Sequence, residues 1–371
     1  MSTPVSALTL ESIPWMSAKS LSHAMREVSL RGPNDSEVWT RLIGRADMIA
    51  HSFNPKQAAL VINSLARIHD KLDKDLMESF LLRFNRKFLP ILIPHTSPLD
   101  MAQICHGLTI MGNIDNKLAV ERVVLLVPQM DPTCVSMCAA ALSSRKSRDL
   151  LQADRTRCLL KLVERVMEFS NTNEQTFAQI LRACATVPGD LVIEKKVVEL
   201  CRQSLIMFER MSMRSLCVCL NSLAKMKNVK GPVVNEILTI VADRAQRGDS
   251  AIVDGASLHQ LAVLLRSLQK LDIKAIAPLV DETFVKYIKT RETCNVPPKT
   301  ACILLSALVE VPGTEVMIAT LLKSYEGPNI KFSPDELRAI DNALNKTVIG
   351  ADLRKLLFLT MTSLNGDQMP L

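Results

Sequence analysis

Aromatic residues are scarce in this chain. Phenylalanine, tyrosine and tryptophan make up 4% of its 371 residues, although hydrophobic residues make up 48%. The apolar content is therefore mainly aliphatic, with many leucine, alanine, methionine and valine residues. A β-sandwich would need more aromatic and β-branched residues, whereas helices pack well through aliphatic side chains. The composition predicts an all-α fold.

Long hydrophobic runs are also missing. No apolar run reaches the roughly 18–20 residues of a membrane-spanning helix, and the longest candidate, around 123–127, is short and flanked by charge. Residues 1–22 contain no apolar core like that of a secretory signal, and the first arginine is Arg26, so no mitochondrial presequence is evident. We expect no membrane contact and find no clear targeting segment.

The ten cysteines form no CxxC pair. Most of them fall on the apolar faces of expected helices, where cysteine packs as a small hydrophobic residue. This pattern favours free thiols in a reducing compartment over a disulfide or zinc framework. We therefore expect no metal site.

Catalytic motifs are absent from the sequence. The six histidines make no HExxH pattern, and the chain has no GxxxxGK[ST], GxGxxG or GxSxG. Acidic pairs such as Asp73 and Asp75 fall at expected helix starts, where carboxylates interact favourably with the helix dipole. We expect a protein that is not an enzyme, with no cofactor and no small-molecule substrate. An enzyme, or the regulatory subunit of one, is the least favoured alternative.

In five segments with similar helix patterns, a proline is followed ten residues later by a leucine. In the clearest copy, residues 54–68, Asn54 is a suitable N-cap and Pro55 stands at the first helical position, where no backbone donor is needed. The other four copies are Pro98 to Leu108, Pro132 to Leu142, Pro298 to Leu308 and Pro334 to Leu344. This constant offset predicts a repeat protein.

The frame extends to copies that lack the proline. We call the Leu65 equivalents the reference position: Met25, Leu65, Leu108, Leu142, Cys184, Leu223, Leu268, Leu308 and Leu344. Successive copies lie about 40 residues apart, as in two-helix solenoid repeats. The preceding residue is always small, and four residues before the reference position the side chain is apolar in every copy after the first. The small residues predict the crossing points of stacked helices, and the apolar ones predict the core.

The sequence therefore predicts an α-solenoid of about nine two-helix repeats. Residues 1–14 are expected to form an irregular lead-in, and residues 365–371 a flexible tail. No linker long enough to separate domains interrupts the chain, so residues 15–364 are expected to form a single superhelix.

A polar position lies two residues before the reference position. Eight of its nine occupants can form hydrogen bonds, although the flanking positions are apolar or small. The same helix face includes the positions nine residues before and two residues after the reference. Together these positions supply the candidate RNA-binding residues: Lys56, Asn63, Arg67, His106, Arg182, Arg214, Asn221, Lys225, Arg266, Lys270, Lys299 and Asn342.

The chemistry of this stripe suits a nucleic acid. Lysine and arginine can bind phosphates, while asparagine, histidine and serine can reach the base edges of a single strand. The net charge of +7 permits an anionic partner without requiring one. The alternative is an ordinary solvated helix face, and the low aromatic content offers few groups for base stacking. Basic residues of the second helices, such as Arg155, Arg157, Lys161 and Arg165, could equally contact an RNA backbone or an acidic partner.

Residues 58–68 (AALVINSLARI), echoed by residues 219–226 (CLNSLAKM), carry a family resemblance. Both segments contain the motif polar residue, small residue, leucine, alanine, cation. This motif resembles the octotricopeptide and heptatricopeptide repeats of organellar proteins. HEAT and armadillo repeats share the period and are a looser match. The RAP domain that often ends such proteins is not recognisable after Ile349.

The resemblance implies a location in the mitochondrial matrix and direct binding of mitochondrial RNA. It also implies protein partners within a ribonucleoprotein, such as a mitochondrial ribosome, one of its assembly intermediates, or an RNA-editing or RNA-processing complex. A protein scaffold without RNA contact is the alternative from the residues themselves. The uneven repeat lengths and the apolar residues Leu357, Phe358 and Met361 would suit a subunit buried in a large assembly.

Overall fold

The computed structural model describes residues 9–31, 36–112, 117–144, 152–247, 257–271 and 297–308, together with Ser333 and Arg338. These residues form helices joined by short loops, and none of them lies in a β-strand. The predicted all-α class is therefore confirmed. The chain divides into two compact units, Met1–Lys196 (unit 1) and Val197–Leu371 (unit 2).

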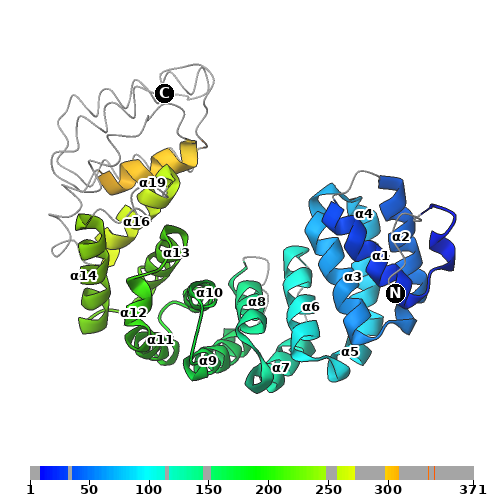
Figure 1. Ribbon diagram of the computed structural model, residues 1–371, viewed down its shortest axis with the longest axis horizontal. Helices are drawn as coiled ribbons and strands as arrows, with labels where there is room; N and C mark the ends of the chain where they lie inside the picture. The colour runs from blue at the N-terminus through cyan, green and yellow to red at the C-terminus, as the bar shows by residue number, and fades with distance from the viewer. Residues whose placement is uncertain are drawn as a thin grey trace, which may run out of the picture. The chain divides into compact units, whose positions relative to one another are not determined.

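Unit 1 contains two series of helices that alternate along the chain (Figure 1). The first helices of its repeats are α1 (Ala18–Arg31), α3 (Pro55–Ile68), α6 (Pro98–Ile110), α8 (Pro132–Ser143) and α10 (Glu174–Cys184). Each of them packs against the next in that order. The second helices are α2 (Ser36–Ile49), α4 (Lys74–Arg83) continued by α5 (Leu89–Leu92), α7 (Lys117–Leu126) and α9 (Gln152–Glu168). Contacts such as α6 with α7 and α8 with α9 join the two series.

Unit 2 repeats part of this pattern. α13 (Met213–Leu223) packs against α16 (Leu258–Leu271), which packs against α19 (Pro298–Leu308). α12 (Leu205–Phe208) contacts α14 (Pro232–Gln246), and α11 (Leu191–Gln203) contains the boundary between the units. Several expected elements lie outside the described residues. These are the second helices of repeats seven and eight, all of repeat nine except Ser333 and Arg338, and the tail 365–371.

Most first helices begin with the same N-cap chemistry. Asn54 accepts a hydrogen bond from the Gln57 amide, and the Gln57 side chain accepts one from the Asn54 amide, which completes a capping box. Four side chains at the equivalent position also accept a hydrogen bond from the amide three residues later, and the first of them completes a capping box as well: Ser97, Asp131, Asn173 and Ser212. Each cap satisfies a backbone donor that the first turn would otherwise leave without a partner. The repeat frame therefore sets where these helices begin.

The frame also identifies the core. All eight described reference positions, from Met25 to Leu308, are buried, and so are all eight small residues that precede them. At three of the small positions the hydroxyl donates a hydrogen bond of 2.6 Å to the carbonyl four residues earlier; these serines are Ser64, Ser222 and Ser267. Each hydroxyl is satisfied within its own helix, so serine can occupy a buried crossing point as alanine does.

One predicted helix is interrupted. The sequence pattern predicts a single second helix over 73–90, whereas the structure has α4, a π-helical segment Phe84–Phe88, and then α5. Pro90 lies at the second position of α5 and has no amide hydrogen to donate to the Arg86 carbonyl. The wider π turn immediately before Pro90 accommodates the proline ring without ending the helical path.

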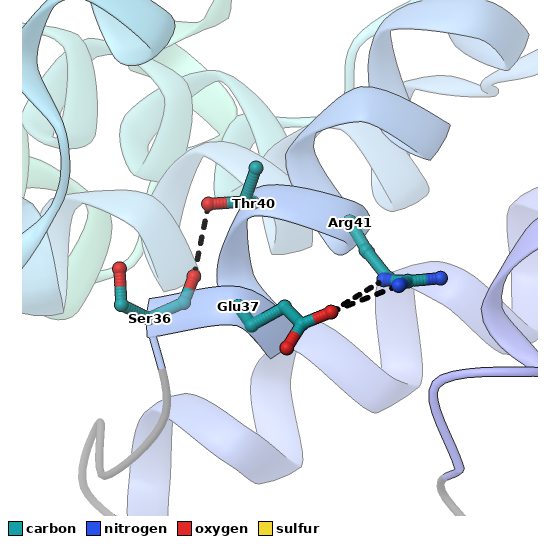
Figure 2. A network of polar contacts seen from close by, with 4 residues as sticks. All are labelled: Ser36, Glu37, Thr40 and Arg41. Carbon is teal, nitrogen blue, oxygen red and sulfur yellow. Dashed lines mark hydrogen bonds and ion pairs between the residues drawn. The ribbon is translucent and has the colours of Figure 1, made fainter.

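The start of α2 shows local surface contacts of the ordinary kind. The Arg41 guanidinium lies 2.8 Å from a carboxylate oxygen of Glu37, and the Thr40 hydroxyl donates to the Ser36 carbonyl at 2.9 Å (Figure 2). Glu37 and Arg41 are one helical turn apart and both are exposed. Such a pair contributes about 0.3–0.5 kcal/mol to helix stability. These contacts stabilise the first turn of α2 and do not join it to another helix.

Candidate nucleic-acid interface

The candidate residues that the structure describes all lie at exposed or half-buried positions. Those in unit 1 are Lys56, Asn63 and Arg67 at α3, His106 on α6 and Arg182 on α10. Those in unit 2 are Arg214, Asn221 and Lys225 at α13, Arg266 and Lys270 on α16, and Lys299 on α19. Asn342 lies outside the described residues. The structure thus places these groups in two sets, one on each unit.

In unit 2, the charged members of the set are all cations. We call Arg214, Lys225, Arg266, Lys270 and Lys299 the cationic ridge; all five side chains are exposed. α13, α16 and α19 contain no aspartate or glutamate, and they pack side by side in that order. Repeated cations without intervening carboxylates create a positive potential that attracts polyanions.

Three of these cations have no partner among the described residues. Arg214, Arg266 and Lys299 form no ion pair and no side-chain hydrogen bond within the part of the chain that the structure describes. Their guanidinium and ammonium groups are exposed, as contact with an external anion requires.

The ridge has an apolar component that the sequence analysis did not single out. Five residues before the reference position stand Val218, Val263 and Ile303, each half-buried. On a helix these positions lie between those of Arg214 and Asn221, of His259 and Arg266, and of Lys299 and Ser306. The surface is therefore a row of aliphatic groups flanked by polar and cationic ones, and periodicity alone could have located it.

Unit 1 differs in charge. α6 and α8 contain no lysine or arginine, although α3 carries Lys56 and Arg67, and α10 carries Arg182. On α6, His106 stands at the position of Arg266, and Gln103 stands at the position of the aliphatic Val263; both are half-buried. Burial lowers the pKa of His106 from its ordinary value of 6.5, so its imidazole is neutral at pH 7 and offers one donor and one acceptor.

Several basic residues of the second helices hold the fold instead of facing outward. Arg165, which the sequence suggests for RNA or protein contact, donates from Nε to the Met130 carbonyl at 3.0 Å and pairs with Glu168 at 2.8 Å. Arg155 is buried. Neither is available as the exposed contact residue expected from residue type, whereas Arg157 and Lys161 are exposed as expected.

The arginine-to-carbonyl contact is a recurring device. Arg45 donates to the Met16 carbonyl, Arg122 to that of Thr96, and Arg244 to that of Phe208. In each case the carbonyl lies shortly before a first helix, and the arginine comes from the second helix that follows it. These contacts tie the two helices of a repeat together and were not visible in the sequence pattern.

Metal and thiol chemistry is limited within the described ranges. They contain no group of three or more histidine, cysteine, aspartate or glutamate side chains that could bind a metal ion. The described cysteines are free and buried, as predicted, and burial raises the pKa of Cys158 and Cys201 to about 12. Cys294 lies outside the described residues. Among the described helices, none combines the length and the apolar character that a membrane span requires.

The sequence was compared with protein-family models and with curated proteins. No protein-family model matches the sequence, and no curated protein matches it either.

Proposed function

We propose that this chain is a non-catalytic α-solenoid that binds single-stranded RNA through the exposed face of its first helices. The observation that carries the proposal is the cationic ridge, where α13, α16 and α19 present cations and no carboxylate. In the proposed architecture, the two stacks of first helices belong to one superhelix of about nine repeats. Exposed lysine and arginine hold the phosphates, as in other proteins that bind a nucleic-acid backbone.

The cellular setting of the proposal comes from the family resemblance. The protein is placed in the mitochondrial matrix, within a ribonucleoprotein such as a mitoribosome, its assembly intermediates, or an editing or processing complex. The buried free cysteines are compatible with a reducing compartment.

A salt titration tests RNA binding directly. The full chain is mixed with a labelled single-stranded RNA of mixed sequence, and the association constant is measured between about 50 and 200 mM salt. We expect the logarithm of the constant to fall linearly with the logarithm of the salt concentration. Binding that is absent at low salt, or that does not respond to salt, contradicts the proposal.

A protein scaffold is the second candidate, and one observation favours it. The second helices of unit 1 expose large apolar side chains: Met48 is 70% exposed, and Ile91 and Leu125 are each 68% exposed. Apolar groups of this size on one layer are typical of surfaces that bind another protein. Crosslinking in cells, followed by recovery of RNA and protein under denaturing conditions, separates the two functions. RNA attached to peptides carrying Asn221 to Lys225 or Arg266 to Lys270 supports RNA binding, and crosslinks to proteins alone support the scaffold.

A further inference from the structure

The exposed faces of α6 in unit 1 and of α16 in unit 2 differ in chemistry, although both helices share one repeat frame. Arg266 of α16 and His106 of α6 both stand two residues before the reference position. One is an exposed, permanently charged group, and the other is a half-buried imidazole. The same position therefore carries a cation on α16 and a neutral group on α6.

In unit 1, three neutral side chains lie on two helices in contact. We call Asn63 of α3 with Gln103 and His106 of α6 the neutral patch; all three are half-buried. α3 packs against α6, and Asn63 and His106 occupy equivalent positions, so the patch spans neighbouring helices. Asparagine, glutamine and neutral imidazole each carry both hydrogen-bond donors and acceptors. Hydrogen bonds to base edges require both kinds of group.

The degree of burial affects how strongly such side chains discriminate between matched and mismatched bases. A half-buried side chain has fewer rotamers available and fewer competing waters than a fully exposed lysine, so a mismatched partner costs more. Exposed cations such as Arg266 and Lys299 can follow a phosphate wherever the strand runs. Phosphates are the same at every nucleotide, so these contacts carry no sequence information.

Resting on the proposed function, we infer that the two units divide recognition between them: the cationic ridge of unit 2 supplies affinity that is independent of sequence, and the neutral patch of unit 1 discriminates among bases. α13, α16 and α19 contain no phenylalanine, tyrosine or tryptophan, and the imidazole of His259 on α16 lies 3.0 Å from the Thr300 hydroxyl, so base stacking adds little on the ridge. α6 contains no cation, so phosphate attraction adds little on its part of the patch.

The chain itself suggests variants that preserve the fold. α8 carries Met137 and Ala140 at the positions that Gln103 and His106 occupy on α6. The variant Asn63→Ala/Gln103→Met/His106→Ala therefore replaces the neutral patch with side chains that the same frame already accepts. The ridge variant is Arg266→Gln/Lys270→Gln/Lys299→Gln, which removes three charges from exposed positions. Thermal unfolding of both variants establishes that they are folded.

Binding of the full-length variants to poly(U), poly(A) and poly(C) is measured over a range of salt. We expect the ridge variant to bind all three RNAs more weakly by a similar factor, with a salt slope smaller by about 0.7 for each phosphate that is no longer neutralised. The patch variant should keep the parent's salt slope and change the ratio of affinities among the RNAs by roughly tenfold.

Three outcomes overturn the division of recognition while leaving RNA binding intact. The first is a parent with no preference among the three RNAs, and the second is a patch variant whose affinity ratios equal the parent's. The third is a ridge variant that alters these ratios as strongly as the patch variant does. A folded parent that binds none of the RNAs at low salt overturns the proposed function itself, and the inference with it.

Discussion

Gly107 of α6 lies so close to Ile62 of α3 that a Cβ atom has no room between them. A Cβ built on Gly107 would be 2.7 Å from Cγ2 of Ile62 and 3.2 Å from the Ile62 carbonyl oxygen. We expect Gly107→Ala to destabilise the protein by about 1–3 kcal/mol, because the helices must separate against their own packing. Urea unfolding measures the change.

Gly44 of α2 is the matched control. A Cβ built there meets no atom within 4 Å. Gly44→Ala should therefore stabilise the protein by about 0.5–1 kcal/mol through helix propensity alone. If both substitutions stabilise the protein to the same extent, α3 and α6 do not cross at Gly107.

The Arg244 contact with the Phe208 carbonyl should contribute measurably to stability. The Arg244 side chain is buried, and its NH1 group lies 2.7 Å from the carbonyl oxygen. Arg244→Met keeps much of the apolar volume but leaves the acceptor without this donor, which should cost about 1–3 kcal/mol in chemical denaturation. Arg247→Met, at a side chain 80% exposed, should change stability by less than about 0.5 kcal/mol. Equal effects of the two substitutions would show that the Arg244 contact is not a structural one.

His106 should make stability depend on pH below neutrality. Burial lowers its pKa in the folded protein, so the unfolded chain binds the proton first as the pH falls. The contribution of His106 to the free energy of unfolding is largest above about pH 6.5, the pKa of histidine in the unfolded chain. It decreases as the pH falls toward the lower pKa of His106 in the folded protein, and below that pH it no longer changes. His106→Gln should remove this component. The difference in free energy of unfolding between parent and variant, measured at several pH values, should shrink on acidification; a constant difference contradicts the assignment.

The buried thiols should resist alkylation while the protein is folded. Burial raises the pKa of Cys158, Cys201 and Cys217 to about 12. At pH 8 this leaves a thiolate fraction of about one in ten thousand, and the thiolate is the reactive form. Peptide mass spectrometry after iodoacetamide treatment should find these three cysteines unmodified in buffer and fully modified in urea. Rapid labelling of any of them without denaturant would mean that its helix opens readily.

The sequence by itself determined where most first helices begin and which of their faces is buried. Asn54, Pro55 and Leu65 act within one helix, through capping, a fixed backbone angle and helical spacing, so their roles follow from local order along the chain. The surface placement of the candidate residues follows in the same way. The sequence predicted the polar position two residues before the reference, but not how deeply each of its side chains is buried. In the structure Asn63 and His106 are half-buried at this position, whereas Arg266 is exposed.

Only the tertiary structure decided which basic residues bind a distant part of the fold. Arg157 and Arg165 belong to the same helix, α9, yet Arg157 is exposed while Arg165 binds the Met130 carbonyl, 35 residues away in sequence. Residue type and helical periodicity describe both arginines equally well. The acceptor comes from a distant loop, and its position depends on how α8 and α9 pack, which no local pattern encodes.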